Sequence, residues 1–157
     1  MTLLVAYGSK HGSTQEVAEA VAERLRAGGR EVDLRRAADV DDLTPYGGVV
    51  LGGSLYVGRW HEDARRFLSR YRDELSALPL AVFALGPKTA EQKDLADART
   101  QLHKALSKTP ELEPRSVAVF GGVIDPSKLR FPLNRLPASD ARDWDAIDAW
   151  VEELAAP

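Results

Sequence analysis

The sequence contains no cysteine, which excludes disulfide bonds, cysteine-ligated zinc, iron–sulfur clusters and thiol catalysis. Histidine is also scarce, and His11, His61 and His103 are too scattered to indicate a metal site without help from carboxylates. No apolar run approaches the roughly 20 residues that a membrane-spanning helix needs. The first five residues lack a basic region and lead directly into a strand pattern, so we expect no signal peptide, no integral membrane segment and a cytoplasmic protein.

Basic residues are not in excess either. The formal net charge of −3 disfavours a general nucleic-acid binder, which needs a concentrated basic surface. No Ser-His-Asp set or glycosidase-like pair of carboxylates can be placed, which disfavours hydrolytic and metal-dependent functions. A length of 157 residues with 44% hydrophobic and 29% charged residues is typical of an ordinary globular protein. We therefore expect a single domain over residues 1–157.

Short apolar runs alternate with helical patterns along the chain. The runs typical of buried parallel strands are Leu3–Tyr7, Val49–Leu51, Leu80–Leu85 and Val117–Phe120, and the alternating run Glu31–Leu34 predicts an edge strand. Helices are predicted from Ser13 to the glycines at 28 and 29, over His61–Leu78, over Thr89–Leu106, and around Trp144, Ile147, Val151 and Leu154. This order predicts an α/β fold of three layers: a doubly wound, five-stranded parallel sheet with strand order 2-1-3-4-5 and a ligand crevice beside the first and third strands.

A turn rich in hydroxyl residues follows the first strand, and its residues are Ser9, Lys10, His11, Gly12, Ser13 and Thr14. In a doubly wound sheet this turn lies at the N-terminus of the first helix, where free amides and a partial positive charge favour a phosphate. An alternative is that Ser13 and Glu16 form a capping box, which completes the helix end without a ligand. The position of the turn, after the first strand of the sheet, favours phosphate binding. The chain has neither a P-loop nor a G-x-G-x-x-G motif.

The string Ser9–Thr14 resembles the flavodoxin pattern [ST]-x-x-G-x-[ST], whose hydroxyls and amides hold the phosphate of FMN. The similarity extends over nearly the whole chain and is closest to the flavodoxin-like family that includes the menaquinone-dependent protoporphyrinogen dehydrogenases. The other matching segments are Gly52–His61, Gly121–Val123 and Arg142–Trp144. The resemblance implies a flavodoxin-like fold, a bound FMN or deazaflavin, and transfer of electrons or hydride.

Three loops at the ends of the later strands are expected to hold the flavin ring. Tyr56 and Trp60 offer flat faces that suit an isoalloxazine, although both could instead pack beneath the loop. The backbone of residues 53–56 is the better candidate for a contact with flavin N5. The loop after the fourth strand has no aromatic residue, which departs from the common flavodoxin pattern. Besides the phosphate turn, the expected cofactor-binding residues are Gly53, Ser54, Leu55, Tyr56, Gly58, Gly86, Pro87, Lys88, Gly121 and Gly122.

Three functions remain open: an oxidoreductase acting on a small substrate or quinone, an electron carrier with protein partners, and a non-redox interaction domain. Carriers often surround the flavin with acidic residues, whereas Lys10, His11, Arg59, His61 and Lys88 are expected near this site, which favours an enzyme. Residues 124–142 resemble a shortened form of the insertion that the related dehydrogenases use toward a hydrophobic substrate or the membrane. Their mixed basic and apolar side chains suit an anionic, apolar partner such as a porphyrin or quinone, or a loop that packs on the core.

Overall fold

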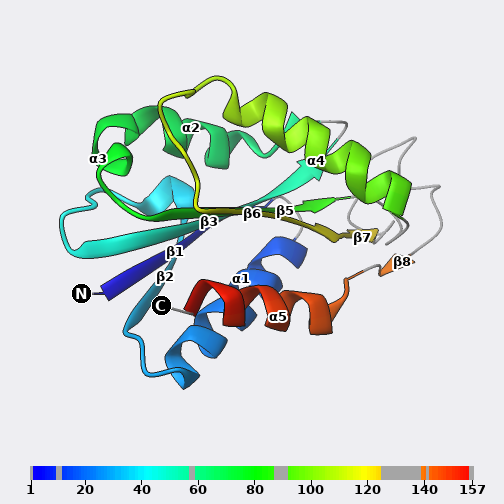
Figure 1. The fold of residues 1–157 in the computed structure, drawn as a ribbon, viewed down its shortest axis with the longest axis horizontal. Helices are drawn as coiled ribbons and strands as arrows, with labels where there is room; N and C mark the ends of the chain where they lie inside the picture. Colours follow the sequence, from blue (N-terminus) through cyan, green and yellow to red (C-terminus); the bar gives the residue numbers. More distant parts are fainter. Residues whose placement is uncertain are drawn as a thin grey trace.

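A computed structural model describes residues 2–9, 12–56, 59–86, 92–124, 139–140 and 142–155. A parallel sheet forms the middle layer, with helices on both faces (Figure 1). Its strands are β1 (Thr2–Gly8), β2 (Val32–Arg36), β3 (Tyr46–Tyr56), β5 (Leu80–Gly86) and β6 (Ser116–Gly121), in the spatial order β2-β1-β3-β5-β6. Counted along the chain, these five strands have the predicted order 2-1-3-4-5, and β2 is the predicted edge strand.

Three short strands lie beyond the prediction. β4 (Arg59–Trp60) folds back antiparallel on the end of β3, and β7 (Val123–Ile124) pairs with β8 (Ser139–Asp140) as a separate antiparallel ribbon. β3 also exceeds the predicted Val49–Leu51 at both ends. Glycines hide its pattern, because a Cβ on Gly52 would lie 2.0 Å from Cζ of Phe83, so only a residue without a side chain fits there.

Helices α1 (Ser13–Ala27) and α5 (Trp144–Ala155) cover one face of the sheet, and α2 (Glu62–Arg70), α3 (Arg72–Ser76) and α4 (Gln92–Leu106) cover the other (Figure 1). The single helix predicted over residues 61–78 is two helices that meet at Tyr71, whose φ of −105° and ψ of 25° depart from helical values. The Tyr71 hydroxyl donates to the carbonyl of Val40 at 2.5 Å, which ties this break to the 3₁₀ turn η1 (Ala37–Asp39) and the residue after it. The predicted start of α4 at Thr89 lies outside the described residues.

The predicted glycine stop of α1 is confirmed. Gly28 is the C-cap, and Gly29 takes a φ of 90°, a conformation that glycine adopts without steric cost. The amide of Gly29 donates to the carbonyl of Arg26 at 2.9 Å, which satisfies one of the last carbonyls of the helix.

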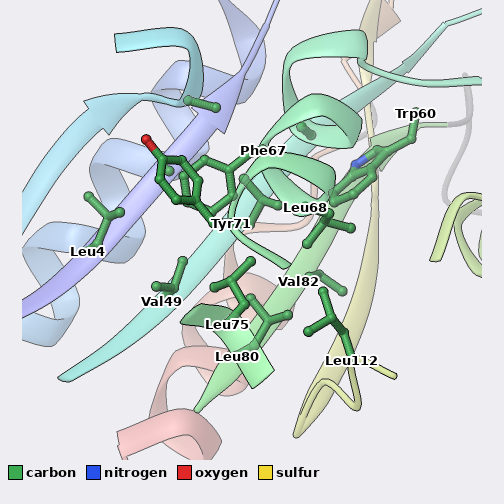
Figure 2. Close-up of a cluster of buried hydrophobic side chains, with 14 of the residues drawn as sticks. Leu4, Val49, Trp60, Phe67, Leu68, Tyr71, Leu75, Leu80, Val82 and Leu112 are labelled. Carbon is green, nitrogen blue, oxygen red and sulfur yellow. The ribbon is translucent and has the colours of Figure 1, made fainter. Parts of the chain in front are cut away.

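The core has one apolar cluster on each face of the sheet. Beneath α2, α3 and α4, side chains from the sheet such as Leu4, Val49 and Val82 meet Phe67, Leu68 and Leu75 (Figure 2). Beneath α1 and α5, Phe83 and Phe120 contact Trp150 with ring centroids 5.8 Å apart. Burial on both faces explains why the central strands have continuous apolar runs. Within the described residues, no helix combines the length and the apolar character needed to cross a bilayer.

Candidate functional site

The register of the sheet brings the ends of four strands into one row. Gly8 pairs with Gly53, Ser54 pairs with Leu85, and Gly86 pairs with Gly121. Because all four strands are parallel, these residues lie at the carboxyl edge, where doubly wound sheets bind ligands. The four strand ends that we expected beside a cofactor, those of β1, β3, β5 and β6, therefore lie at this edge.

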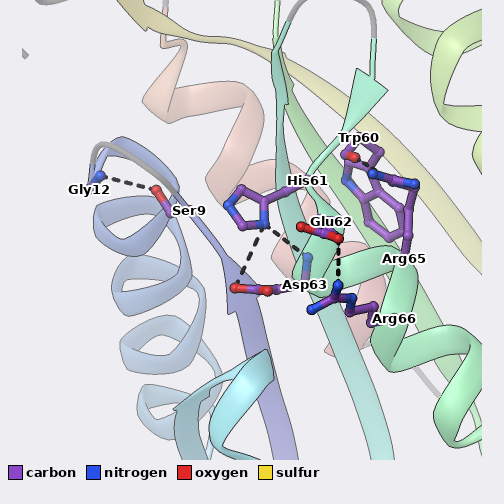
Figure 3. A network of polar contacts seen from close by, with 8 residues as sticks. All are labelled: Ser9, Gly12, Trp60, His61, Glu62, Asp63, Arg65 and Arg66. Atoms are coloured by element: carbon purple, nitrogen blue, oxygen red, sulfur yellow. Dashed lines mark hydrogen bonds and ion pairs between the residues drawn. The ribbon is translucent and has the colours of Figure 1, made fainter. Parts of the chain in front are cut away.

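The turn after β1 leads into α1 through Gly12, which is the N-cap residue with a φ of 85°. The Gly12 amide donates to the hydroxyl oxygen of Ser9 at 3.0 Å (Figure 3). The Gly12 carbonyl accepts the amide of Glu16 at 3.1 Å and so begins the helical hydrogen bonds. A residue with a Cβ would adopt this left-handed conformation only at a cost of about 1–2 kcal/mol, which explains a glycine at this position.

The capping-box interpretation of this turn is wrong. Ser13 is already inside α1, and no side chain caps the helix among the residues that the structure describes. The carboxylate of Glu16 instead accepts from Nη1 of Arg142 at 2.8 Å, and the Arg142 guanidinium also lies 5.0 Å from the centroid of the Trp144 ring. Within the described part of the chain, no side chain bonds to the first amides of α1, an arrangement that suits an anion.

Thr14 provides the most specific sign of a ligand. Its side chain is 0% exposed, and its Oγ1 has no hydrogen-bond partner among the described residues. A buried hydroxyl without a partner costs about 1–3 kcal/mol, so such groups call for an explanation. A phosphate at the start of α1 would accept this hydroxyl together with the free amides. The residues present therefore fit a phosphate group.

His61 adjoins the same turn from the other face of the sheet. It is the N-cap of α2, and its Nδ1 accepts the amide of Asp63 at 3.1 Å. A Cβ on Gly8 would lie 2.8 Å from this Nδ1, so the imidazole packs directly against the end of β1. Burial raises the pKa of Tyr7, the neighbour of Gly8.

Trp60 does not present a face to the site. Its side chain is 1% exposed, and its Nε1 donates to the carbonyl of Gly53 at 3.1 Å. The carbonyl of Ser54 accepts the amide of His61 at 2.8 Å, so both of these strand carbonyls already have one partner. Trp60 is therefore a core residue that fixes the loop after β3. Of the two alternatives left open for it, the structure supports packing beneath the loop.

Glycines let the neighbouring strand ends approach closely. A Cβ on Gly122 would lie 2.3 Å from the carbonyl oxygen of Gly86, and a Cβ on Gly86 would lie 2.7 Å from Cδ1 of Leu55. Close packing between β5 and the residue after β6 accounts for these glycines. They shape the floor of the expected ring site, but nothing in their geometry by itself requires a ligand.

Several predicted site residues remain predictions. Lys10, His11, Gly58, Pro87 and Lys88 lie outside the described residues, as do residues 125–138, and only the backbone of Tyr56 is described. Sequence reasoning did not identify two other features of the site, namely the ion pair of Arg142 with Glu16 and the capping role of His61. The second had a signal, since His61 directly precedes two acidic residues at the start of a helical pattern.

The parallel sheet and its strand order define a doubly wound α/β protein, a class that binds ligands at the carboxyl edge of the sheet. The family model of the flavodoxin domain matches residues 4–135. The chain belongs to the flavodoxin-domain family. Membership of this family supports a flavin-binding redox protein as the general class of function.

Individual relatives are distant. Protoporphyrinogen IX dehydrogenase (quinone) of Escherichia coli strain K12 is 21% identical over 137 residues, which cover 86% of this chain and 73% of the relative. The protein of the same name from Leishmania major is 28% identical over 129 residues, covering 77% of this chain and 54% of the relative.

Solved structures share the fold over nearly the whole chain. Oxidised Flavodoxin 2 from Bacillus cereus has a TM-score of 0.59 and 20% identity, covering 99% of this chain and 95% of its own. Rubredoxin oxygen:oxidoreductase from Desulfovibrio gigas has a TM-score of 0.63 and 14% identity, covering 98% of this chain and 35% of its own. These likenesses concern the fold alone.

Proposed function

We propose that this chain binds FMN at the carboxyl edge of its sheet, with the phosphate at the turn between β1 and α1. The observation that carries the proposal concerns Thr14: among the described residues, its buried Oγ1 has no hydrogen-bond partner, and no side chain caps the adjacent start of α1. The proposed phosphate ligands are this hydroxyl, the hydroxyls of Ser9 and Ser13, and the amides of the turn. Family membership supports FMN, whereas it gives no support to a deazaflavin. When bound, FMN supplies one- and two-electron transfer.

The ring is proposed to lie over the ends of β3, β5 and β6. There, Gly86 and Gly122 let neighbouring strand ends approach closely, and Gly53 leaves room for the side chains of Trp60 and Ala64. The hydrogen bond from Trp60 to the carbonyl of Gly53 holds β4 in place against the end of β3. In this proposal the chain contributes the strand ends that support the ring and the turn after β1 that binds the phosphate.

The test is a titration of the purified chain with FMN and with riboflavin, following flavin fluorescence and the visible absorption spectrum. We expect saturable binding of one FMN per chain and much weaker binding of riboflavin, because riboflavin lacks the phosphate. Absence of saturable FMN binding at tens of micromolar would refute the proposal. Equal affinity for FMN and riboflavin would show that the turn after β1 does not bind the phosphate.

We further propose that the redox partner is a small molecule of the quinone type rather than a carrier protein. The distant relatives, both named protoporphyrinogen IX dehydrogenase (quinone), support this class. Arg59 supports it as well, because this exposed cation pairs in register with Tyr56 at the tip of β3 and β4. A positive charge at that position attracts anionic acceptors.

The corresponding measurement is the rate at which reduced protein passes electrons to an anionic quinone, across a series of ionic strengths. Salt should slow this reaction, because exposed charges act over a Debye length of about 8–10 Å. Arg59→Glu should abolish the salt dependence. Arg30→Glu is the matched control, since Arg30 is exposed in the turn between α1 and β2 at the opposite edge of the sheet. Rates that ignore salt, or that change equally in both variants, would favour the carrier function instead.

A further inference from the structure

Of the two nitrogens of the His61 imidazole, Nδ1 has a hydrogen-bond partner among the described residues and Nε2 has none. Nδ1 accepts the amide of Asp63 at 3.1 Å, so this nitrogen carries a lone pair and the neutral ring carries its proton on Nε2. The Asp63 carboxylate lies 3.9 Å from the same Nδ1, on the same side of the ring. The hydrogen bond from the Asp63 amide therefore assigns the tautomer of the neutral ring and the direction in which its Nε2–H points.

That direction is toward the turn after β1. Figure 3 shows the ring between Asp63 and the turn marked by Ser9 and Gly12, with Nδ1 on the Asp63 side and the other nitrogen on the side of the turn. The side chain is 19% exposed, and Nε2 has no hydrogen-bond partner among the residues that the structure describes. An N–H donor, an unpartnered hydroxyl on Thr14 and a helix start without a side-chain cap thus adjoin one turn.

We infer that His61 is a ligand of the anion in this turn and donates its Nε2–H to a phosphate oxygen, while its Nδ1 caps α2. This inference deepens the proposed FMN site and rests on it. Serine, threonine, asparagine and aspartate are the usual helix N-caps, and each offers one acceptor close to the backbone. Asparagine carries its acceptor and its N–H donors on one short amide, whereas histidine carries its N–H donor on the opposite side of a longer, rigid ring.

The absence of a side chain on Gly8 supports this arrangement. A Cβ there would lie 2.8 Å from Nδ1 of His61 and 3.2 Å from the amide nitrogen of Ala64, so the ring and the first turn of α2 occupy this space. The imidazole is therefore held against the strand that leads into the phosphate turn. A donor fixed in advance loses little conformational entropy on binding, and its bond to a charged phosphate is of the stronger, charge-assisted kind.

The substitution His61→Asn separates the two roles. Asparagine is among the best N-caps, so the variant keeps an acceptor for the Asp63 amide. Its amide N–H donors lie on a shorter side chain, so they do not extend toward the turn as far as Nε2 of the imidazole does. We expect ligand-free His61→Asn to unfold at nearly the same temperature as wild type. We also expect its affinity for FMN to fall about tenfold or more, while its weaker affinity for riboflavin stays unchanged. His103→Asn, which alters an exposed histidine on α4, should behave as wild type.

Each outcome decides the question. If His61→Asn binds FMN as tightly as wild type, His61 is only a cap and the inference fails while the proposed function stands. If FMN and riboflavin weaken equally, His61 acts on the ring or through the fold, and the inference again fails. If wild type binds no FMN, the proposed function fails and this inference fails with it.

A second measurement uses the unaltered protein, in case the variant folds poorly. Long-range ¹H–¹⁵N spectra should show His61 as the Nε2–H tautomer in ligand-free protein, and the Nε2 proton should shift and exchange more slowly on addition of FMN but not of riboflavin. A proton on Nδ1, or an Nε2 proton that does not respond to FMN, would overturn the inference.

Discussion

Replacing Thr14 with valine exchanges a fully buried hydroxyl for a methyl group of nearly the same shape. In the ligand-free protein this hydroxyl has no partner among the described residues. An unsatisfied buried group costs about 1–3 kcal/mol, and valine and threonine differ little in helix propensity. Thr14→Val should therefore raise the free energy of unfolding of the ligand-free protein, by about 1 kcal/mol or more.

The same substitution should act in the opposite direction on FMN. A hydrogen bond to a charged group contributes about 1.5–3 kcal/mol, and each 1.4 kcal/mol is a factor of ten in the dissociation constant, so FMN should bind about 10- to 150-fold more weakly. Riboflavin, which lacks the phosphate, should bind Thr14→Val and wild type alike. A gain in stability together with a loss of phosphate-dependent affinity is the signature of a hydroxyl reserved for a ligand.

The assays are urea unfolding of the ligand-free proteins and fluorescence titrations with both flavins. Thr109 gives the matched control, because it is 2% exposed and its hydroxyl donates to the carbonyl of Leu106 at 3.4 Å. Thr109→Val should lower the free energy of unfolding and leave the ratio of FMN to riboflavin affinities unchanged. If Thr14→Val also destabilises the ligand-free protein and leaves that ratio unchanged, Thr14 is an ordinary core residue and the reasoning fails.

Three other substitutions test the site and its support. Gly122→Ala should lower the free energy of unfolding by about 1–3 kcal/mol, because its Cβ would lie 2.3 Å from the carbonyl oxygen of Gly86, and an unchanged urea midpoint would contradict this close approach. Trp60→Phe should cost about 1–3 kcal/mol, because a buried strand carbonyl loses its donor at 3.1 Å, and a neutral effect in the same assay would show that the carbonyl finds water. The hydrogen bonds from Arg72 lower the pKa of the Glu111 carboxyl to about 2. The stabilisation from this pair is present above the ordinary pKa of the carboxyl and is lost as pH falls through the lowered pKa. A ¹³C titration of Glu111 should therefore give a midpoint near 2 in wild type and near the ordinary 4.5 in Arg72→Gln. Equal midpoints would refute the ion pair.

The strand order was predictable because the central strands are buried on both faces and have continuous apolar runs. The true length of β3 was not predictable, since Gly52 and Gly53 interrupt its apolar pattern. Glycine stands at these positions because Phe83 and Trp60 occupy the space where other side chains would lie. The break at Tyr71 was also missed, because the periodicity continues across it while a hydrogen bond to distant Val40 accompanies the turn. Local patterns thus located the elements, and contacts distant in sequence set their limits.

The same distinction applies to the candidate site. Ser13 and Glu16 satisfy the capping-box pattern, yet Glu16 binds Arg142, which lies 126 residues away and was not identifiable as its partner from local sequence. Trp60 satisfies the expectation of a flat aromatic face near the strand ends, but its indole N–H is used to hold the carbonyl of Gly53. In both cases a residue of the expected type serves the structure that surrounds the site.

Elements from both layers of helices meet at the end of β1. On one face, Arg142 just before α5 holds Glu16 in the first turn of α1. On the other face, His61 at the start of α2 packs against Gly8. The positive ends of two helix dipoles, each equivalent to roughly half an elementary charge, therefore lie next to the same strand end. These two backbone dipoles support the proposed anion site in a chain whose net charge is −3.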